Sequence, residues 1–362
     1  MQFLSNVQLA PYTTFKIGGP AKFFCAVKAA EELAAAVQFA ADNNLKMFIL
    51  AGGSNILVAD EGFGGLAIKM ELAGRKIVKE DKESVWLDVA AGENWDSTVE
   101  FAGKHGWWGV ENLSHIPGTC GAIAVQNVGA YGQEASQVVE SVRVFDTADG
   151  SQKTFQNREC KFGYRSSIFN TRDRGRYVIL SLVMKLDKVP APELSYRDLK
   201  KYFSGKVPTL ADIRGFVTAI RDKKFPFPTE AKNGNAGSFF KNLILSQEFY
   251  EQVRATIENN MGESAVVALE QKKITVGQTV KIPAAFLLDI CGLKGVSNGN
   301  VKINAHQPLV IVNATGKAAA AEVLETAGMV LKTVKVNTGL SLTVEPELIG
   351  FSPQQLAGYG II

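Results

Sequence analysis

The sequence predicts an α+β protein built from three consecutive parts. Its 362 residues exceed the roughly 150 residues of an average domain, so two or three domains are expected. Hydrophobic residues make up 46% of the chain and charged residues 21%, which is typical of a globular protein. Strand and helix patterns alternate along the chain, and their mixture changes twice. We expect a βαβ part at residues 1–70, a β-rich part at 71–210 and an α+β part at 211–362.

A strand, a helix and a second strand account for most of the first part. Residues 21–27 and 46–50 are apolar runs of strand length. Residues 29–43 show the spaced apolar pattern of a helix that ends at two asparagines. The second strand leads directly into residues 51–55, a turn of small residues.

The second and third parts have their own patterns. In the second part we expect strands at 84–90, 141–146 and 177–186 and a helix at 95–105. In the third part we expect helices at 212–223, 246–260 and 317–337 and strands at 306–312 and 340–344. Pro226 and Pro228 should stop the first of these helices, because proline cannot continue a helix interior.

Composition excludes several classes of protein. The net charge is +3, from 39 basic and 36 acidic residues, which is too balanced for a nucleic-acid-binding surface. No apolar run approaches the ~18 residues that cross a bilayer. The first ten residues lack the pattern of a signal peptide. We therefore expect a cytoplasmic protein with no membrane or nucleic-acid partner.

Metal and disulfide chemistry are not expected either. The four cysteines and three histidines are scattered, with no C-x-x-C pair and no H-E-x-x-H motif. This spacing argues against a zinc site and against a disulfide framework. We expect no bound metal.

Two glycine-rich segments, a turn at residues 51–55 and a loop at residues 116–132, predict a backbone that can cradle an anion. Glycine lets backbone N–H groups approach a ligand closely, and successive N–H groups can form a nest for a pyrophosphate. The second segment carries no charged residue. Neither has the sequence of a Walker loop or of the Rossmann fingerprint, and an ordinary turn is the alternative for the first. Together they favour a dinucleotide cofactor.

Three further motifs carry candidate side chains. Arg165, among the apolar residues 162–169, can bind a carboxylate through two hydrogen bonds or pair with a structural carboxylate. Ser238 lies between small residues and two aromatics, in a narrow slot or at a helix N-terminus. Glu345 and Glu347 are two residues apart, so an extended chain would point both to one side. Arg165 is a candidate partner for them, and exposure on an edge strand is the alternative.

In this order, these motifs and their neighbours resemble the UDP-N-acetylenolpyruvoylglucosamine reductases, the MurB family. The matching stretches are residues 14–19, 52–55, 116–121, 126–132, 162–165, 234–242, 293–295 and 345–347. Each stretch is weak alone, but together they keep one order across nearly the whole chain. The resemblance implies an FAD-binding unit of the vanillyl-alcohol-oxidase type in two subdomains, followed by an α+β substrate-binding domain.

The resemblance also implies a reaction. NADPH reduces non-covalently bound FAD, and UDP-N-acetylglucosamine enolpyruvate is then reduced to UDP-N-acetylmuramate. Hydride passes from the flavin N5 to C3 of the enolpyruvyl group, and Ser238 gives a proton to C2. Arg165 and Glu347 polarise the substrate carboxylate, with Glu345 as the fallback for Glu347. This step belongs to peptidoglycan precursor synthesis, hence to cell-wall formation, cell shape and cell division. We expect the protein to be a monomer.

Individual site residues follow from the same resemblance. Those placed against FAD are Gly52, Gly53, Ser54, Asn55, Ile116, Pro117, Gly118, Thr119, Gly121, Ala122, Gln126, Asn127, Gly129, Ala130 and Tyr131. Those placed against the substrate are Tyr164, Tyr196, Lys224, Asn242, Lys281, Lys294 and Gln307. Residues 194–199 resemble a loop found in one type of the family, in which a tyrosine closes over the substrate.

The sequence departs from the family pattern at three points. The segment between Lys224 and Gly234 is slightly long, which bears on the assignment of Lys224. Leu348 and Ile349 follow Glu347, where the family usually has valine and a basic residue. Leu243 follows Asn242, where a proline is common. The competing interpretations are an FAD-dependent oxidase or dehydrogenase of the same flavin superfamily, and a non-catalytic nucleotide-sugar-binding protein.

Overall fold

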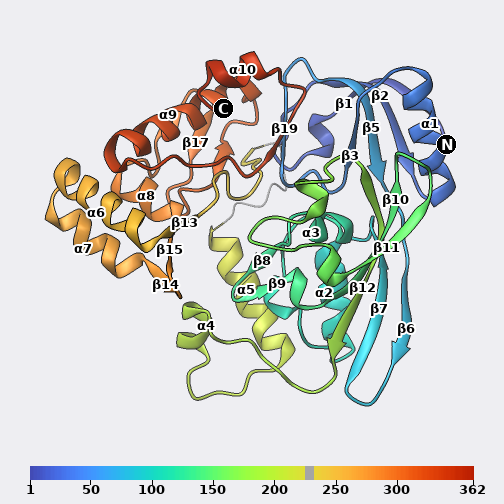
Figure 1. Ribbon diagram of the computed structural model, residues 1–362, viewed down its shortest axis with the longest axis horizontal. Coiled ribbons are helices and arrows are strands. Elements are labelled where there is room, and N and C mark those ends of the chain that lie inside the picture. The colour runs from blue at the N-terminus through green and yellow to red at the C-terminus, as the bar shows by residue number, and fades with distance from the viewer. Residues whose placement is uncertain (225–231) are drawn as a thin grey trace. The chain divides into compact units, whose positions relative to one another are not determined.

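A computed structural model of the chain describes residues 1–224 and 232–362 (Figure 1). The chain forms two compact units, and each unit draws on separate segments of the sequence. Unit 1 consists of Met1–Val7, Ala21–Gly52 and Gly64–Asp222, and unit 2 consists of Gln8–Pro20, Gly53–Phe63 and Lys223–Ile362. The division into three consecutive parts stays a prediction, and Pro226 and Pro228 lie outside the described residues.

Unit 1 contains a four-stranded sheet in the order β1-β2-β5-β3, a five-stranded sheet in the order β11-β10-β12-β7-β6, and the small hairpin β8-β9. The strands that lie wholly or mainly in this unit are β1 (Leu4–Gln8), β2 (Pro20–Val27), β3 (Met47–Leu50), β5 (Phe63–Met70), β6 (Arg75–Glu80), β7 (Ser84–Ala90), β8 (Gly129–Ala130), β9 (Gln133–Glu134), β10 (Val139–Asp146), β11 (Gln152–Gln156) and β12 (Tyr177–Asp187). Its helices are α1 (Ala30–Asp42), α2 (Trp95–Lys104), α3 (Cys120–Val125), α4 (Arg197–Tyr202) and α5 (Leu210–Lys224).

The five-stranded sheet of unit 1 covers the core with one face. In β7, Val85, Leu87 and Val89 are buried, whereas Trp86 and Asp88 between them are partly exposed. This alternation follows from the two-residue period of a strand. Helix α3 packs against β7 and β12, and α2 packs against α3 (Figure 1). The residues between α2 and β10 are thereby held close to the sheet.

Unit 2 contains the sheets β13-β15-β14 and β16-β17-β18 and the parallel pair β19-β4. Its strands are β4 (Ile56–Val58), β13 (Leu243–Ser246), β14 (Ile274–Val276), β15 (Thr279–Ile282), β16 (Ser297–Asn298), β17 (Val301–Ile303), β18 (Ile311–Asn313) and β19 (Glu347–Ile349). Its helices are α6 (Gln247–Met261), α7 (Glu263–Lys272), α8 (Ala284–Ile290), α9 (Ala320–Thr338) and α10 (Pro353–Gly358). Helix α9 packs against α6 and α8 (Figure 1). Apolar side chains from these helices and from the strands form the core.

Most of the predicted helices and strands are confirmed within one to three residues at each end. The predicted helix at 246–260 begins one residue later, because the Ser246 hydroxyl accepts a hydrogen bond from the Phe249 N–H at 3.2 Å and so serves as the N-cap. Among the described residues, no helix has both the length and the hydropathy needed to cross a membrane.

Two predicted strands and one predicted loop are wrong. Residues 306–310 form a turn, because the Asn304 carboxamide oxygen accepts from two following N–H groups, so the strand begins only at Ile311. Residues 340–344 are irregular up to Val344, although Leu340 and Leu342 are buried as the pattern predicts. Residues 116–132 are not one loop, because they contain α3 and β8.

Candidate active site

Gly52 of the first glycine-rich segment and Gly118 of the second lie directly against each other within unit 1. A side chain at Gly52 would place its Cβ only 2.6 Å from the Cα of Gly118. Gly118 itself has φ of +130°, a conformation that side chains rarely adopt. Both glycines are therefore required by the close approach of the two backbones, which places the predicted cofactor-binding segments side by side.

Thr119 gives a direct indication that this place accepts a ligand. It is 7% exposed, and its hydroxyl has no hydrogen-bond partner among the described residues. The residue precedes α3 without capping it through its side chain. Leaving such a group unsatisfied costs about 1–3 kcal/mol, so a bound polar group is the natural partner. Together with the paired glycines, this hydroxyl fits the pyrophosphate of FAD.

Asn127 uses its whole carboxamide within the protein. Its Nδ2 donates to Glu134 Oε2 at 2.9 Å and to the Gly163 carbonyl at 3.0 Å. Its Oδ1 accepts from the Ser136 N–H at 2.9 Å. The Asn127 side chain therefore connects residues 134–136 and Gly163 with the second glycine-rich segment.

Arg165 lies at the tip of a tight turn in unit 1. Gly163 and Ser166 exchange backbone hydrogen bonds of 2.9 and 3.2 Å on either side of it. Arg165 has φ of +53°, which is strained for a residue with a long side chain. Its Nη2 donates to the Gly129 carbonyl at 3.2 Å, and its own carbonyl accepts from Asn170 at 3.2 Å. The turn is thus fixed against the second glycine-rich segment.

Tyr196 immediately precedes α4 and faces Tyr131 of the same unit. The two rings meet edge to face with their centres 5.2 Å apart. Burial raises the pKa of Tyr131 to about 12, and burial together with the nearby Asp198 carboxylate raises the pKa of Tyr196. Both hydroxyls therefore stay protonated near neutral pH and can donate hydrogen bonds.

In unit 2, Thr14 joins two predicted motifs. Its N–H donates to the Gly53 carbonyl at 3.0 Å, and its hydroxyl donates to the Asn235 carbonyl at 2.7 Å. A Cβ on Gly234 would lie 2.2 Å from the Phe15 carbonyl oxygen, so glycine is needed at this approach. The segment that carries Ser238 is thereby fixed to the residues after Gly52.

Ser238 lies in an extended stretch and not at a helix N-terminus. It forms a β-bridge with Val310, and the Phe239 N–H donates to the Leu309 carbonyl at 2.7 Å. On the other side, the Glu345 N–H donates to the Phe239 carbonyl at 2.9 Å. Ser238 is half-buried beside the fully buried Phe239. The serine motif and the C-terminal glutamates are therefore neighbours, as their proposed joint chemistry needs.

The two glutamates differ in their surroundings. Glu347 begins β19, which pairs with β4 of the same unit, and its N–H donates to the Asn55 carbonyl at 2.9 Å. The Glu345 carbonyl accepts from Asn55 Nδ2 at 3.4 Å. Glu345 is half-buried and Glu347 is exposed. Asn55, predicted to contact FAD, thus holds the backbone of both glutamates.

Known proteins are similar to this chain over nearly its whole length. A family model described as an FAD binding domain matches residues 21–156, and one described as the C-terminal domain of UDP-N-acetylenolpyruvoylglucosamine reductase matches residues 228–349. The reductase of Flavobacterium johnsoniae is 37% identical over 96% of this chain and 100% of its own length. That of Chromobacterium violaceum is 36% identical over 96% of this chain and 99% of its own length.

The chain belongs to the UDP-N-acetylenolpyruvoylglucosamine reductase family. The crystal structure of the Thermus caldophilus member is similar, with a TM-score of 0.63 and 25% identity over 96% of this chain and 98% of that one. These findings confirm the predicted family, the α+β class with an FAD-binding domain, and an FAD-dependent oxidoreductase.

The predicted substrate-binding residues of this family member differ in the contacts that they make within the protein. Asn242 Oδ1 accepts from the Ala284 N–H at 2.9 Å, at the start of α8. Lys294 pairs with Asp289 at 2.6 Å. Gln307 lies in the turn that precedes β18, and its N–H donates to Asn304. The other two lysines, Lys224 and Lys281, lie at the end of α5 and within β15.

Sequence reasoning missed a polar cluster that supports the second glycine-rich segment. Arg214 on α5 contacts Asp96 through two hydrogen bonds of 2.7 and 3.0 Å. Arg221, one helical heptad further on, is buried and donates to the His115 carbonyl at 2.8 Å. His115 in turn contacts Asp222 at 2.9 Å. The seven-residue spacing of the two arginines was the available signal.

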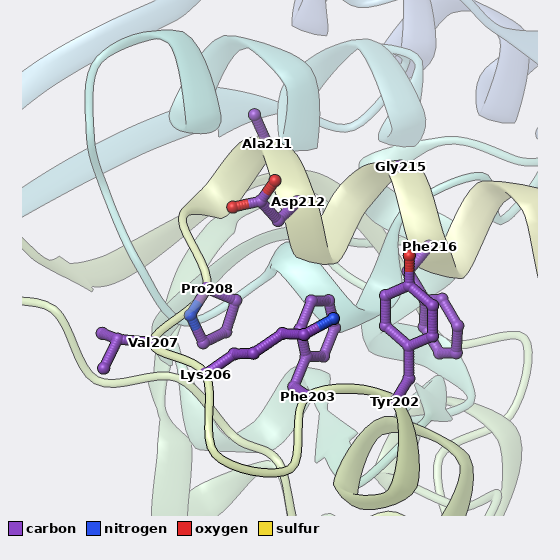
Figure 2. Close-up of a pocket in the computed structure, with 9 residues that line it drawn as sticks. All are labelled: Tyr202, Phe203, Lys206, Val207, Pro208, Ala211, Asp212, Gly215 and Phe216. Atoms are coloured by element: carbon purple, nitrogen blue, oxygen red, sulfur yellow. The ribbon is translucent and has the colours of Figure 1, made fainter.

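A separate pocket of about 440 Å³ lies beside α4 and α5 in unit 1. Figure 2 shows the rings of Tyr202, Phe203 and Phe216 around it. None of the predicted site residues lines this pocket, so it is distinct from the glycine-rich segments.

Proposed function

We propose that the chain catalyses the NADPH-dependent reduction of UDP-N-acetylglucosamine enolpyruvate to UDP-N-acetylmuramate. The observation that carries this proposal is the hydrogen-bonded junction in unit 2 between the Ser238 stretch and Glu345. This main-chain junction places the candidate proton donor beside the segment that carries both candidate carboxyl groups, a combination that an FAD-dependent oxidase does not need. The names of the relatives, which cover nearly the full chain, support the same reaction.

Arg165 acts on the enolpyruvyl carboxylate. Bound FAD supplies the hydride that adds to C3, and negative charge then develops at C2 and on the carboxylate. The guanidinium is a fixed cation that stabilises this charge. The hydrogen bond from Arg165 Nη2 to the Gly129 carbonyl holds the guanidinium in place before the reaction.

Ser238 gives the proton to C2. A serine hydroxyl is a weak acid, but the carbanion that forms is a strong base, so the transfer runs downhill. The β-bridge at Ser238 and the hydrogen bonds of Phe239 fix the backbone that carries the hydroxyl.

Glu347 assists at the substrate carboxylate, with Glu345 as its fallback. Two ionised carboxyl groups would repel each other, so this role requires a protonated glutamate that donates a hydrogen bond. Tyr196, Lys224, Asn242, Lys281, Lys294 and Gln307 supply donors for the UDP diphosphate. A cytoplasmic location, a monomeric state and the preference for NADPH stay predictions.

The oxidase alternative gains no support from a covalent flavin link at Cys120. This thiol is completely buried, and burial raises its pKa to about 12. The reactive thiolate is therefore scarce at neutral pH.

Single substitutions test the proposed roles. In Ser238→Ala, we expect the step with UDP-N-acetylglucosamine enolpyruvate to slow by about 10²–10⁴-fold, the usual contribution of a general acid, while reduction of FAD by NADPH is unchanged. Ser341→Ala, at an exposed serine of the same unit, is the matched control. An unchanged second step in Ser238→Ala would remove the proposed proton donor.

A glutamine pair distinguishes the glutamates. Glu347→Gln should slow the same step because a neutral amide is a weaker hydrogen-bond donor than a carboxylic acid, and Glu345→Gln should retain most of the rate. The reverse order would assign the role to Glu345. Full turnover in both variants would show that no titrating acid is needed there.

A further inference from the structure

We infer that Asn112 is a positioning residue for substrate binding, which holds the Tyr196 segment against the second glycine-rich segment. This inference rests on the proposed function, because the role of Tyr196 follows from that function.

Asn112 joins two stretches that are far apart in the sequence. The residue is fully buried. Its Nδ2 donates to the Tyr131 carbonyl at 2.8 Å and to the Glu193 carbonyl at 2.8 Å. Both partners accept hydrogen bonds, so the orientation of the carboxamide is set by its surroundings. One amide group thus connects the predicted FAD segment with the start of the tyrosine segment.

The neighbours of Asn112 keep it in place. Its own N–H donates to Gln133 Oε1 at 2.9 Å, and Gln133 Nε2 donates to Glu111 Oε1 at 2.8 Å. Glu111 Oε2 accepts from the Gly109 N–H at 2.7 Å. All three side chains are at least 96% buried, so the network is shielded from water.

The connection leads directly to Tyr196. Glu193 Oε1 accepts from the Ser195 N–H at 2.7 Å, which fixes the turn between the two residues. The Tyr196 ring then packs on Tyr131, whose carbonyl is the other acceptor of Asn112. Gly132 permits this approach, since a Cβ there would lie 3.2 Å from the Glu193 side chain. The position of the Tyr196 phenol therefore depends on the amide donor of Asn112.

The Asn112 carboxamide oxygen has no partner among the described residues. An apolar side chain would avoid leaving this buried acceptor unsatisfied. The asparagine therefore contributes its two donated hydrogen bonds at this position. A substitution that keeps the shape of the side chain but removes the donors measures the effect of these two bonds.

The test is the steady-state kinetics of Asn112→Asp with UDP-N-acetylglucosamine enolpyruvate. The aspartate has the same shape but presents an acceptor to two carbonyl oxygens. We expect KM for this substrate to rise about tenfold with kcat changed much less, as for the loss of a binding interaction. Reduction of FAD by NADPH and the flavin spectrum should match the wild type.

Asn157→Asp is the matched control. Asn157 Nδ2 also donates to two carbonyls of unit 1, those of Ser136 at 2.8 Å and Val139 at 2.6 Å, but it has no link to residues 193–196. We expect its KM to stay at the wild-type value. Glu193→Ala loosens the same turn without disturbing the core and should raise KM by a smaller factor, which keeps the inference testable if Asn112→Asp does not fold.

A double-mutant cycle with Tyr196→Phe separates positioning from a general loss of stability. If Asn112 acts through Tyr196, Asn112→Asp adds little to KM in the Tyr196→Phe background. Additive effects, or an unchanged KM in both Asn112→Asp and Glu193→Ala, would overturn the role of Asn112 while the proposed function stands. A wild-type enzyme whose FAD is reduced by NADPH but not reoxidised by this substrate would overturn both the proposed function and the role of Asn112.

Discussion

The Arg165 turn of unit 1 and the Ser238 stretch of unit 2 hold their key side chains in opposite ways. Arg165 has a strained backbone, and side-chain amides of Asn127 and Asn170 fix its turn. Ser238 lies in extended backbone that is bonded to main-chain groups on both sides. The Arg165 turn therefore depends on the side chains of particular neighbouring residues, whereas the Ser238 stretch depends mainly on hydrogen bonds between main-chain groups.

Within the Arg165 turn, the largest effect is expected at Arg165 itself. Arg165→Lys retains the charge but loses the planar fork, and we expect the step with UDP-N-acetylglucosamine enolpyruvate to slow by about 10²–10³-fold, as for loss of a transition-state donor. Stopped-flow absorbance of the flavin measures this step. Arg158→Lys, at an exposed arginine of the same unit, is the control, and equal rates in the two variants would contradict the role of Arg165.

The close approach of the glycine-rich segments should make FAD binding sensitive to a single methyl group. Gly52→Ala forces Cβ against the Cα of Gly118, and overpacking of about 1–3 kcal/mol should weaken FAD binding about tenfold or more. FAD titration followed by flavin fluorescence measures the affinity. In Gly64→Ala the added Cβ meets no atom within 4 Å, so FAD binding should be retained. Equal affinities would show that the two backbones can separate.

A pair of buried asparagines tests the comparison between the turn and the stretch. Asn127→Ala removes the bond to the Gly163 carbonyl and should displace Arg165, slowing the step with the enolpyruvyl substrate by about tenfold, consistent with 1–3 kcal/mol for broken buried hydrogen bonds. Asn235→Ala removes local bonds to the Asn233 carbonyl and Gly237 N–H, but the bridges around Ser238 remain. Its rate should change less. A larger effect in Asn235→Ala would reverse the comparison.

The smallest effect concerns the acid sensitivity of unit 1. Lys153 and Arg176 hold the pKa of the buried Asp146 carboxyl well below its ordinary value of 3.8. Because the pKa is lower in the folded than in the unfolded chain, the ionised Asp146 stabilises the fold at pH values above 3.8. This stabilisation is lost as the pH falls below that value. The difference in thermal midpoint between wild type and Asp146→Asn should therefore be largest above about pH 4 and shrink at lower pH. A constant difference would remove Asp146 from the acid response.

Sequence patterns predicted well where local residue spacing determines the structure. The alternation in β7 and the capped helix after Ser246 are examples. The sequence patterns failed where a distant partner determines the secondary structure. At residues 340–344 the buried leucines alternate as in a strand, but among the described residues Val344 alone forms a β-bridge, to Phe240. The motif resemblance identified candidate residues, but it could not show that Asn127 is fully engaged within the protein. Nor could it reveal Asn112, whose role comes from carbonyls far away in the sequence.

The central claim is that bound FAD passes reducing equivalents from NADPH to UDP-N-acetylglucosamine enolpyruvate in this chain. An anaerobic absorbance record of the dialysed protein tests it most directly, with NADPH added first and the enolpyruvyl substrate second. We predict flavin bands that bleach with NADPH and return with the substrate. Bands that bleach and do not return would contradict the substrate assignment, and the absence of flavin bands even after FAD is added would contradict the cofactor site.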